Sequence, residues 1–277
     1  MTILQAVILG LVQGLTEFIP ISSTAHLRIV PALLGWGDPG AAASAVIQLG
    51  TLLAVLIYFS RDVARITAAF FSGLARGKPF EEHQSRLGWY IIAGSVPIGF
   101  VGLAAKDFIE TGARSLWIIA GSLIGLAILL WVAERIAARS ELRVIGDLRL
   151  SDALAVGLGQ CLALVPGSSR SGTTIMMGLF RRFTHEAAAR FSFLLSIPAI
   201  FASGVFELVA EWEHLASIGW LPIAVATLFS FLSGWWSIHF LLRYLRTHTT
   251  AVFIVYRIAL GIAVVGLLLA GVLEPIG

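Results

Sequence analysis

The sequence contains very little charge for its length. Only 13% of its 277 residues are Asp, Glu, Lys or Arg, whereas about 25% is usual for a soluble domain. Hydrophobic residues make up 58% of the chain, and the mean hydropathy is +0.91. The composition therefore excludes an ordinary soluble domain and indicates several membrane-spanning segments.

Cysteine is almost absent as well. The single Cys161 lies in an apolar stretch, so neither an intramolecular disulfide nor a cysteine-rich metal site is expected. We interpret Cys161 as a small buried residue. The net charge of +3 comes from basic residues that are dispersed through connecting segments, which argues against a nucleic-acid partner. Residues 1–12 contain no Lys or Arg, so no cleavable signal is expected.

Long apolar runs are abundant. A bilayer is crossed by about 20 consecutive apolar residues in a helix, and six runs reach that length. They cover residues 44–60, 88–105, 116–133, 191–210, 220–242 and 251–273. The sequence thus predicts an all-α polytopic membrane protein with six transmembrane helices.

Basic residues in the connections indicate which side of the membrane each connection faces. Lys and Arg number 5, 4, 3 and 2 in connections 61–87, 134–150, 181–190 and 243–250. Connection 106–115 contains two, and 211–219 contains none. Because an excess of Lys and Arg marks the cytoplasmic side, we expect the first four inside and the other two outside. This alternation requires segment 150–180 to begin and end inside, with segment 1–40 on the outer side.

A short phrase occurs twice in the chain. The pattern G-L-x-Q-x-L, followed by P-x-S-S, is found at 10–15 and 20–23 and again at 157–162 and 166–169. The copies are 147 positions apart before the proline and 146 after it, which suggests that one residue was dropped. Similar short motifs also arise by chance in a sequence rich in Gly, Leu and Ala. The distribution of Lys and Arg among the connections is independent evidence against that alternative.

Both copies lie in segments too short to span a membrane. The apolar run is 13 residues long before Pro166 and 11 residues long before Gln13, lengths typical of re-entrant or buried pieces. We therefore predict two re-entrant helical hairpins, each followed by three spanning helices, in one integral membrane domain of residues 1–277. The first repeat covers about 1–133, the cytoplasmic connection 134–150, and the second repeat about 151–277. Because three spans are an odd number, the second repeat is inverted and the hairpins meet near the midplane.

The second copy has the composition of a phosphate site. A helix starting there would present free N–H groups and a positive dipole end, both of which attract anions. The guanidinium of Arg170 matches phosphate oxygens. The predicted phosphate-binding residues are Ser168, Ser169, Arg170, Ser171, Gly172, Thr173 and Thr174. The alternative is a capped helix start with Arg170 directed to a lipid headgroup.

The first copy offers the other half of a hydrolytic site. Gln13 and Glu17 are four residues apart and share a helical face, where they could hold a hard divalent cation. Ser22, Ser23 and His26 fall within one turn, so the imidazole could activate a hydroxyl. A buried histidine with a purely structural role is the alternative for His26.

Four sequence motifs together resemble those of the undecaprenyl-diphosphatase family linked to bacitracin resistance. They are Q-G-L-T-E-F-I-P-I-S-S-T-A-H-L at 13–27, Q-L-G at 48–50, Q-C-L-A-L-V-P-G-S-S-R-S-G-T-T at 160–174 and F-S-F-L-L-S-I-P-A at 191–199. The resemblance covers essentially the whole chain. It implies removal of one phosphate from undecaprenyl diphosphate, which recycles the lipid carrier for peptidoglycan synthesis.

The same resemblance implies a bacterial cytoplasmic-membrane protein that forms a homodimer and uses Mg²⁺ or Ca²⁺. It points to Glu17, Ser23, His26 and Arg170 as the catalytic residues. The metal would be bound by Glu17 and Gln13, although many family members have Glu at the position of Gln13, so Glu17 is expected to be the main anionic ligand.

We expect displacement at the terminal phosphorus, with Ser23 as nucleophile and His26 as its base or as the acid for the leaving group. These roles could be exchanged, or water could attack directly. The site is expected to open to the outer side. A rival function is a polyprenyl-phosphate or small-anion transporter, because inverted repeats and broken helices also occur in transporters. Arg257, within the last span, could pair with a carboxylate or serve the site, and we favour a structural role.

Overall fold

The computed structural model describes residues 1–38, 40–104 and 115–275, and their regular elements are all helices apart from one isolated bridge. In chain order they are α1 (Ile3–Phe18), α2 (Ser23–Leu33), α3 (Gly40–Tyr58), α4 (Ser60–Ala75), α5 (His83–Ala104), α6 (Leu116–Ala137), the 3₁₀ turn η2 (Ile145–Asp147), α7 (Leu150–Gln160), the 3₁₀ turn η3 (Cys161–Leu164), α8 (Arg170–Phe180), α9 (His185–Ala210), α10 (Trp212–Ile218), α11 (Trp220–Tyr244) and α12 (Ala251–Leu269). The expectation of an all-α fold is confirmed.

Six of these helices are long and apolar enough to cross a membrane: α3, α5, α6, α9, α11 and α12. They coincide with the six predicted spans and differ from them by a few residues at their ends. Helix α9 begins earlier than expected because the Thr184 side chain accepts a hydrogen bond from the amide of Ala187. The end of the predicted span 88–105 and nearly all of connection 106–115 lie outside the described residues.

Two helices were not predicted from the sequence. Helices α4 and α10 fall within stretches that were expected to be connections. Helix α4 buries Ile66, Ala69 and Gly73 on one face, a helical spacing of apolar residues that the neighbouring charges obscured. That face covers α5, so connection 61–87 is largely a packed helix.

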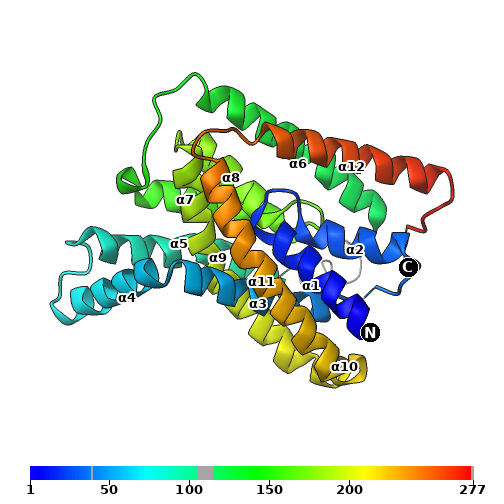
Figure 1. The fold of residues 1–277 in the computed structure, drawn as a ribbon. Coiled ribbons are helices and arrows are strands. Elements are labelled where there is room, and N and C mark those ends of the chain that lie inside the picture. The colour runs from blue at the N-terminus through cyan, green and yellow to red at the C-terminus, as the bar shows by residue number, and fades with distance from the viewer. Residues whose placement is uncertain (39, 105–114, 276–277) are drawn as a thin grey trace.

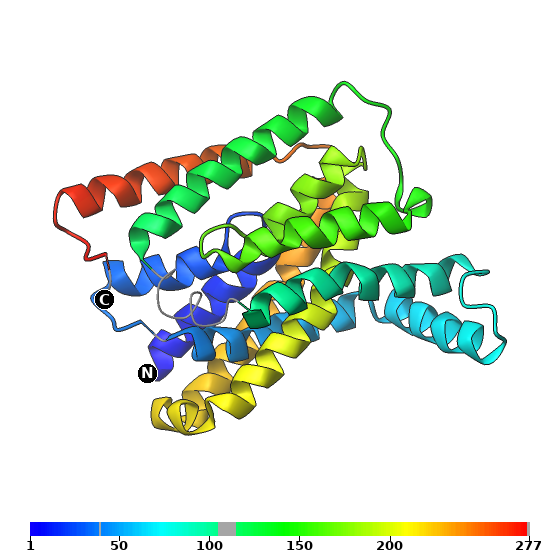
Figure 2. The same cartoon turned by 180° about the vertical axis from the view of Figure 1, so that it is seen from behind.

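The two halves of the chain exchange contacts. Helix α1 of the first half packs along α11 of the second, and α7 of the second half packs along α5 of the first. Helices α6 and α12, the last of each half, lie side by side along one flank of the bundle (Figures 1 and 2). These reciprocal pairings are what an internal repeat requires. The re-entrant path of the short helices α1–α2 and α7–α8 through a membrane stays a prediction.

Glycines allow these exchanged helices to approach closely. A Cβ added at Gly14 would overlap the Ser233 hydroxyl of α11, and one added at Gly157 would overlap the carbonyl of Gly94 in α5. Small residues at such crossings permit the backbone contact that stabilises helix pairs in membranes.

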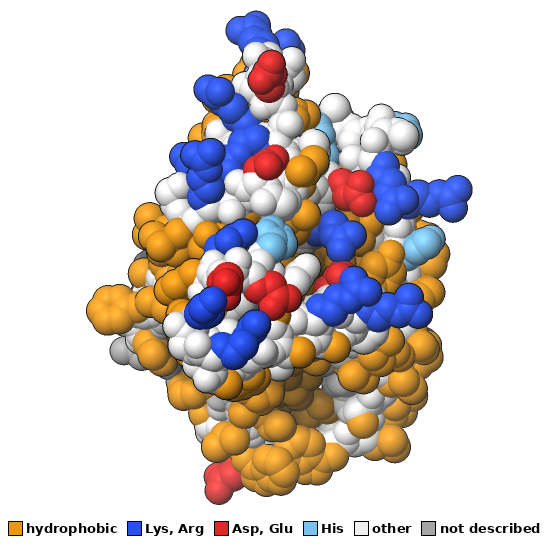
Figure 3. All heavy atoms as spheres, turned by 90° about the vertical axis from the view of Figure 1, so that its left-hand side faces the viewer, with side chains coloured by type: hydrophobic (Ala, Val, Ile, Leu, Met, Phe, Trp, Pro, Cys, Tyr) orange, Lys and Arg blue, Asp and Glu red, His pale blue; other side chains and the backbone are white. Residues whose placement is uncertain are grey.

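The four connections with the predicted cytoplasmic location lie at one end of the bundle. The Arg143 amide donates to the Arg182 carbonyl, and the Arg143 carbonyl accepts from the Thr184 amide. The Thr250 amide donates to the Glu134 carboxylate at 2.7 Å, and Arg190 forms an ion pair with Asp62 at 2.8 Å. Figure 3 shows Lys and Arg side chains gathered on this end. The grouping agrees with the alternation that the charge pattern predicts.

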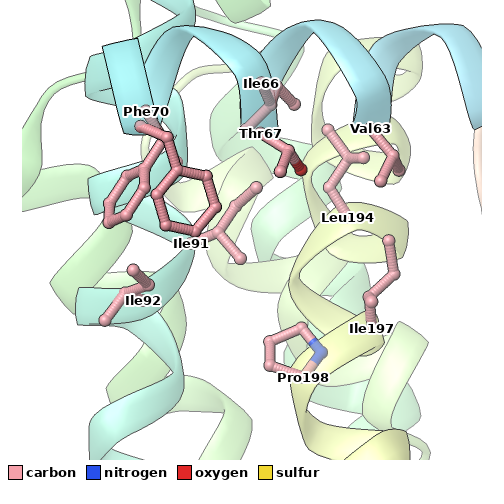
Figure 4. Close-up of a pocket in the computed structure, with 11 residues that line it drawn as sticks. Val63, Ile66, Thr67, Phe70, Ile91, Ile92, Leu194, Ile197 and Pro198 are labelled. Atoms are coloured by element: carbon pink, nitrogen blue, oxygen red, sulfur yellow. The ribbon is translucent and has the colours of Figure 1, made fainter. Parts of the chain in front are cut away.

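An apolar cavity of about 280 Å³ lies between α4, α5 and α9 (Figure 4). Its walls are side chains such as Ile66, Phe70, Ile91 and Leu194, and Thr67 supplies its one hydroxyl. A lining of this kind offers a phosphate no cation and only one hydroxyl. A more polar cavity lies elsewhere among the described residues.

Candidate active site

The two broken segments meet at the centre of the bundle. Each consists of a helix, a short loop and a second helix: α1–α2 in the first half and α7–α8 in the second. Ser22 caps α2 with a φ of 77°, and Ser169 caps α8 with a φ of 71°. Non-glycine residues rarely adopt positive φ, so the same unusual conformation in both loops identifies them as copies of one local structure.

This geometry corrects the register of the repeat. The equivalent caps Ser22 and Ser169 are 169 − 22 = 147 positions apart, the same offset that separates Gln13 from Gln160. The expectation of a dropped residue is therefore wrong, because it aligned the prolines instead of the backbone. In the corrected register, Ser23 is equivalent to Arg170.

Glu17 forms an ion pair that joins the two copies. One carboxylate oxygen accepts the hydroxyl of Ser23 and the amide of Gln13, each at 2.7 Å. The other oxygen forms an ion pair with the guanidinium of Arg170. Glu17 is 5% exposed, and pairing with Arg170 offsets the cost of burying its charge. Sequence reasoning named all four residues, and the fold brings them together.

A cavity of about 130 Å³ opens beside this cluster. Its lining residues are Glu17, Ser23, Thr24, Gln48, Ile98, Ala163, Ser169 and Arg170. The first residues of α2 and of α8 both lie in its wall, so two helix N-termini face one space. Each end carries unsatisfied N–H groups and a partial positive charge, which makes the cavity suited to a highly charged anion.

Most of the other predicted phosphate-binding residues do not line the cavity. Thr173 and Thr174 donate their hydroxyls to the Arg170 carbonyl at 3.0 and 2.8 Å. Ser171 donates to the Ile19 carbonyl at 3.2 Å, and the amide of Gly172 donates to the Ser169 cap at 3.1 Å. These groups hold the start of α8 in shape.

Ser168 is likewise absent from the lining. It is 1% exposed, and its hydroxyl has no partner among the described residues. Within the predicted phosphate set, the cavity wall therefore includes only Ser169 and Arg170.

His26 contacts Tyr256 and not the hydroxyl of Ser23, which it was expected to activate. Its Nδ1 lies 2.7 Å from the Ser22 carbonyl oxygen, and its Nε2 lies 2.7 Å from the hydroxyl of Tyr256. Since a carbonyl only accepts, Nδ1 carries a proton and the neutral ring accepts at Nε2. Ser23 donates to Glu17 instead, and His26 does not line the cavity. In this arrangement the group placed to accept a proton from Ser23 is Glu17.

Arg257 joins the two loops. Its guanidinium donates five hydrogen bonds, all to backbone carbonyls: those of Pro20, Gly167, Ser168, Ser122 and Leu123. It is 1% exposed. Because every N–H of the side chain is used, Arg257 fixes the loops relative to α6, in agreement with its interpretation as a structural residue.

The predicted site omitted six polar or lining residues. Thr24, Gln48, Ile98 and Ala163 line the cavity, and Tyr256 binds His26. Gln160 is fully buried, and neither atom of its amide has a partner among the described residues. A lone glutamine within an apolar run was the signal available for Gln48.

The predicted metal site can be tested on its donor atoms. In the ranges that the structure describes, no three His, Cys, Asp or Glu side chains gather as a metal site would require. The Oε1 atom of Gln13 is buried without a partner, next to Glu17. One carboxylate and one free amide oxygen fit a hard cation that takes its remaining ligands from water and phosphate.

Comparisons with known proteins agree with this geometry. Residues 6–263 match the family model described as bacitracin resistance protein BacA. Three relatives named undecaprenyl-diphosphatase come from Chlorobium phaeobacteroides, Chlorobaculum tepidum and Myxococcus xanthus. They are 53%, 52% and 54% identical over 99% of this chain and cover 100%, 100% and 92% of their own lengths. The chain belongs to the BacA bacitracin resistance protein family.

Proposed function

We propose that the cavity between α2 and α8 removes the terminal phosphate of undecaprenyl diphosphate, yielding undecaprenyl phosphate and inorganic phosphate. Relatives that match nearly the whole chain are named for this activity. The observation that carries the proposal is the convergence of two helix N-termini and Arg170 on one cavity that also contains Glu17 and Ser23. The product is the lipid carrier that cell-wall synthesis reuses, and bacitracin resistance follows from the family.

The charges of the site support phosphoryl transfer. Arg170 leaves Glu17 for the incoming phosphate, whose oxygens offer a bidentate partner. The helix N-termini stabilise the charge on the transferred group. Released from its ion pair, Glu17 is free to act as the base for Ser23.

The proposed reaction has two steps. In the first, Ser23 Oγ bonds to the terminal phosphorus, the Ser23 proton passes to Glu17, and the bond between that phosphorus and the bridging oxygen breaks. Undecaprenyl phosphate leaves. The proton on Glu17 passes to solvent, which restores the carboxylate. In the second step, a water oxygen bonds to the phosphorus of the phosphoserine, and the bond between that phosphorus and Ser23 Oγ breaks. The water proton passes to Glu17 and from Glu17 to Ser23 Oγ, and inorganic phosphate is released. His26 holds the start of α2 through its contacts with Ser22 and Tyr256.

A divalent cation, Mg²⁺ or Ca²⁺, belongs to the proposal. Glu17 and the free Oε1 of Gln13 would hold it. When bound, it would supply positive charge beside the phosphate oxygens. Because Gln13 is neutral, we expect weak cation binding that strengthens when the diphosphate is present.

The setting of the enzyme is also part of the proposal. We expect a multi-pass protein of the bacterial inner membrane, with the isoprenyl chain on apolar helix surfaces and the cavity open to the outer side. We further expect a homodimer, which light scattering of the detergent-solubilised protein would report. The orientation rests on the basic end of the bundle and the positive-inside rule.

The deciding experiment measures phosphate release by purified protein from undecaprenyl diphosphate with Mg²⁺. We expect turnover by the wild type and a loss of at least about a hundred-fold in Arg170→Leu, since Arg170 is the cation beside the phosphate. Arg182→Leu is the matched control, because it removes a cation from the other end of α8. Liposomes that translocate polyprenyl phosphate while the purified protein releases none would instead establish the transporter.

A further inference from the structure

Gln48 is an unusual residue in helix α3. The helix is apolar, with a mean hydropathy of 2.0 over its most hydrophobic window. Its other polar side chains have partners. Ser44 donates to the Gly40 carbonyl at 2.8 Å and Thr51 to the Gln48 carbonyl at 2.7 Å, and the Tyr58 hydroxyl lies 3.4 Å from Nδ1 of His239. Such local bonds let a hydroxyl exist within a membrane helix. Gln48 has no equivalent bond for its amide.

Gln48 also differs from the other polar side chains that line the cavity. Six polar side chains line the cavity, and five have a partner in the protein. Ser23 and Arg170 bind Glu17, Thr24 binds the amide of Gly167, and Ser169 accepts the amide of Gly172. Gln48 is the lining residue whose side chain makes no hydrogen bond with any described residue.

A carboxamide at this position needs a partner. Gln48 is partly buried, and a ligand that covered its amide without bonding to it would cost about 1–3 kcal/mol. Helix α3 contributes no other lining residue, so Gln48 reaches the cavity from a helix outside the two broken segments α1–α2 and α7–α8. Besides water, the acceptors that the cavity can receive are those of its ligand.

We propose that Gln48 is a substrate-binding residue that donates Nε2–H to a phosphoryl oxygen of the diphosphate. This inference rests on the proposed function, because it concerns the same cavity. The donor is neutral and does not change charge during the reaction. We assign the hydrogen bond to the substrate as it binds, before the reaction begins, so its loss should raise KM more than it lowers kcat.

The test compares three proteins in detergent: the wild type, Gln48→Leu and Gln48→Glu. Leucine removes the amide while keeping a similar volume, and we expect KM to rise about ten- to hundred-fold, the range for a lost hydrogen bond to a charged group. Glutamate places a negative charge against the phosphate and should raise KM further. Thr51→Val, one turn away, removes a hydroxyl bonded only to its own helix and should leave KM unchanged.

A binding measurement separates this inference from the chemistry. Undecaprenyl diphosphate is titrated by tryptophan fluorescence into Ser23→Ala and into Ser23→Ala combined with Gln48→Leu. Weaker binding by the double variant supports the role, and equal affinity overturns it even when both proteins are folded. If the wild type releases no phosphate, the proposed function itself fails. If the wild type is active and Gln48→Leu and Gln48→Glu have its KM, the assignment of Gln48 alone fails.

Discussion

Glu17 receives hydrogen bonds from both halves of the chain, and this concentration of contacts sets its chemistry. The Glu17 carboxylate is 5% exposed and forms an ion pair with Arg170, which offsets the cost of burying its charge. The same carboxylate accepts the Ser23 hydroxyl at 2.7 Å. The pair Glu17–Ser23 is thus preformed before substrate arrives, and only the partner of Arg170 has to change.

Adjacent serines give a sharp test of this arrangement. We expect Ser23→Ala to lower kcat at least about a hundred-fold, because it removes the proposed nucleophile. Ser22→Ala should remain active but less stable by about 1 kcal/mol, because Ser22 caps α2 and accepts the amide of Ala25. Phosphate release and thermal unfolding of both variants check the prediction. A fully active Ser23→Ala enzyme would favour direct attack by water.

At the scale of elements, the crossing of α1 and α11 depends on the absence of side chains. Gly14 lies against the backbone and Ser233 hydroxyl of α11, whereas Gly266 in α12 has open space around it. We expect Gly14→Ala to destabilise the protein by about 1–3 kcal/mol through overpacking. Gly266→Ala should cause no loss, since alanine favours a helix. Thermal unfolding followed by tryptophan fluorescence distinguishes the two variants. Equal melting temperatures would show that α1 and α11 can move apart to accept a methyl group without loss of stability.

Asp152 ties the basic end of the bundle to α7. Burial alone would raise the pKa of this carboxyl, but hydrogen bonds from Arg143 and Arg181 and from the Arg149 amide hold the pKa below its ordinary value. The residue lies in the first turn of α7, outside the six spanning helices.

A carboxyl with a lowered folded-state pKa stabilises the fold above its unfolded pKa, about 3.9, and loses that contribution as the pH falls. We therefore expect the melting temperature of the wild type to fall between about pH 5 and pH 3. Asp152→Asn should be less stable at pH 7 and lose less on acidification. Parallel melting curves for the two proteins would show that Asp152 contributes no pH dependence.

At the scale of the whole molecule, the two ends of the bundle should face opposite compartments. A cysteine at Lys78, 61% exposed beside α5, should react with a membrane-impermeant maleimide only after the cytoplasmic side is opened. A cysteine at Glu213, exposed in α10, should react in intact spheroplasts. Cys161→Ser provides the background. Labelling of both positions from one side would contradict the proposed orientation.

Much of this architecture was predictable because it depends on local sequence. Apolar run length determined the six spanning helices, and the residue types of the two copies indicated Glu17, Ser23 and Arg170. Contacts between distant elements were not predictable. The bond between His26 and Tyr256 joins residues 230 positions apart, and the side-chain directions of Thr173 and Thr174 depend on how α8 packs. The error in the register of the repeat had the same origin, because the identical P-x-S-S motifs occupy backbone positions that are not equivalent.

The equivalence of Ser23 and Arg170 has a consequence for how such a site can arise. If two identical half-length chains assembled with the same twofold arrangement, each would place the same side chain at this position. The cavity would then contain two serines or two arginines, and never a hydroxyl opposite a guanidinium. Joining the halves in one polypeptide removes that constraint, because each copy can change alone. The catalytic asymmetry of this cavity therefore requires two halves of different sequence, which a single joined polypeptide supplies.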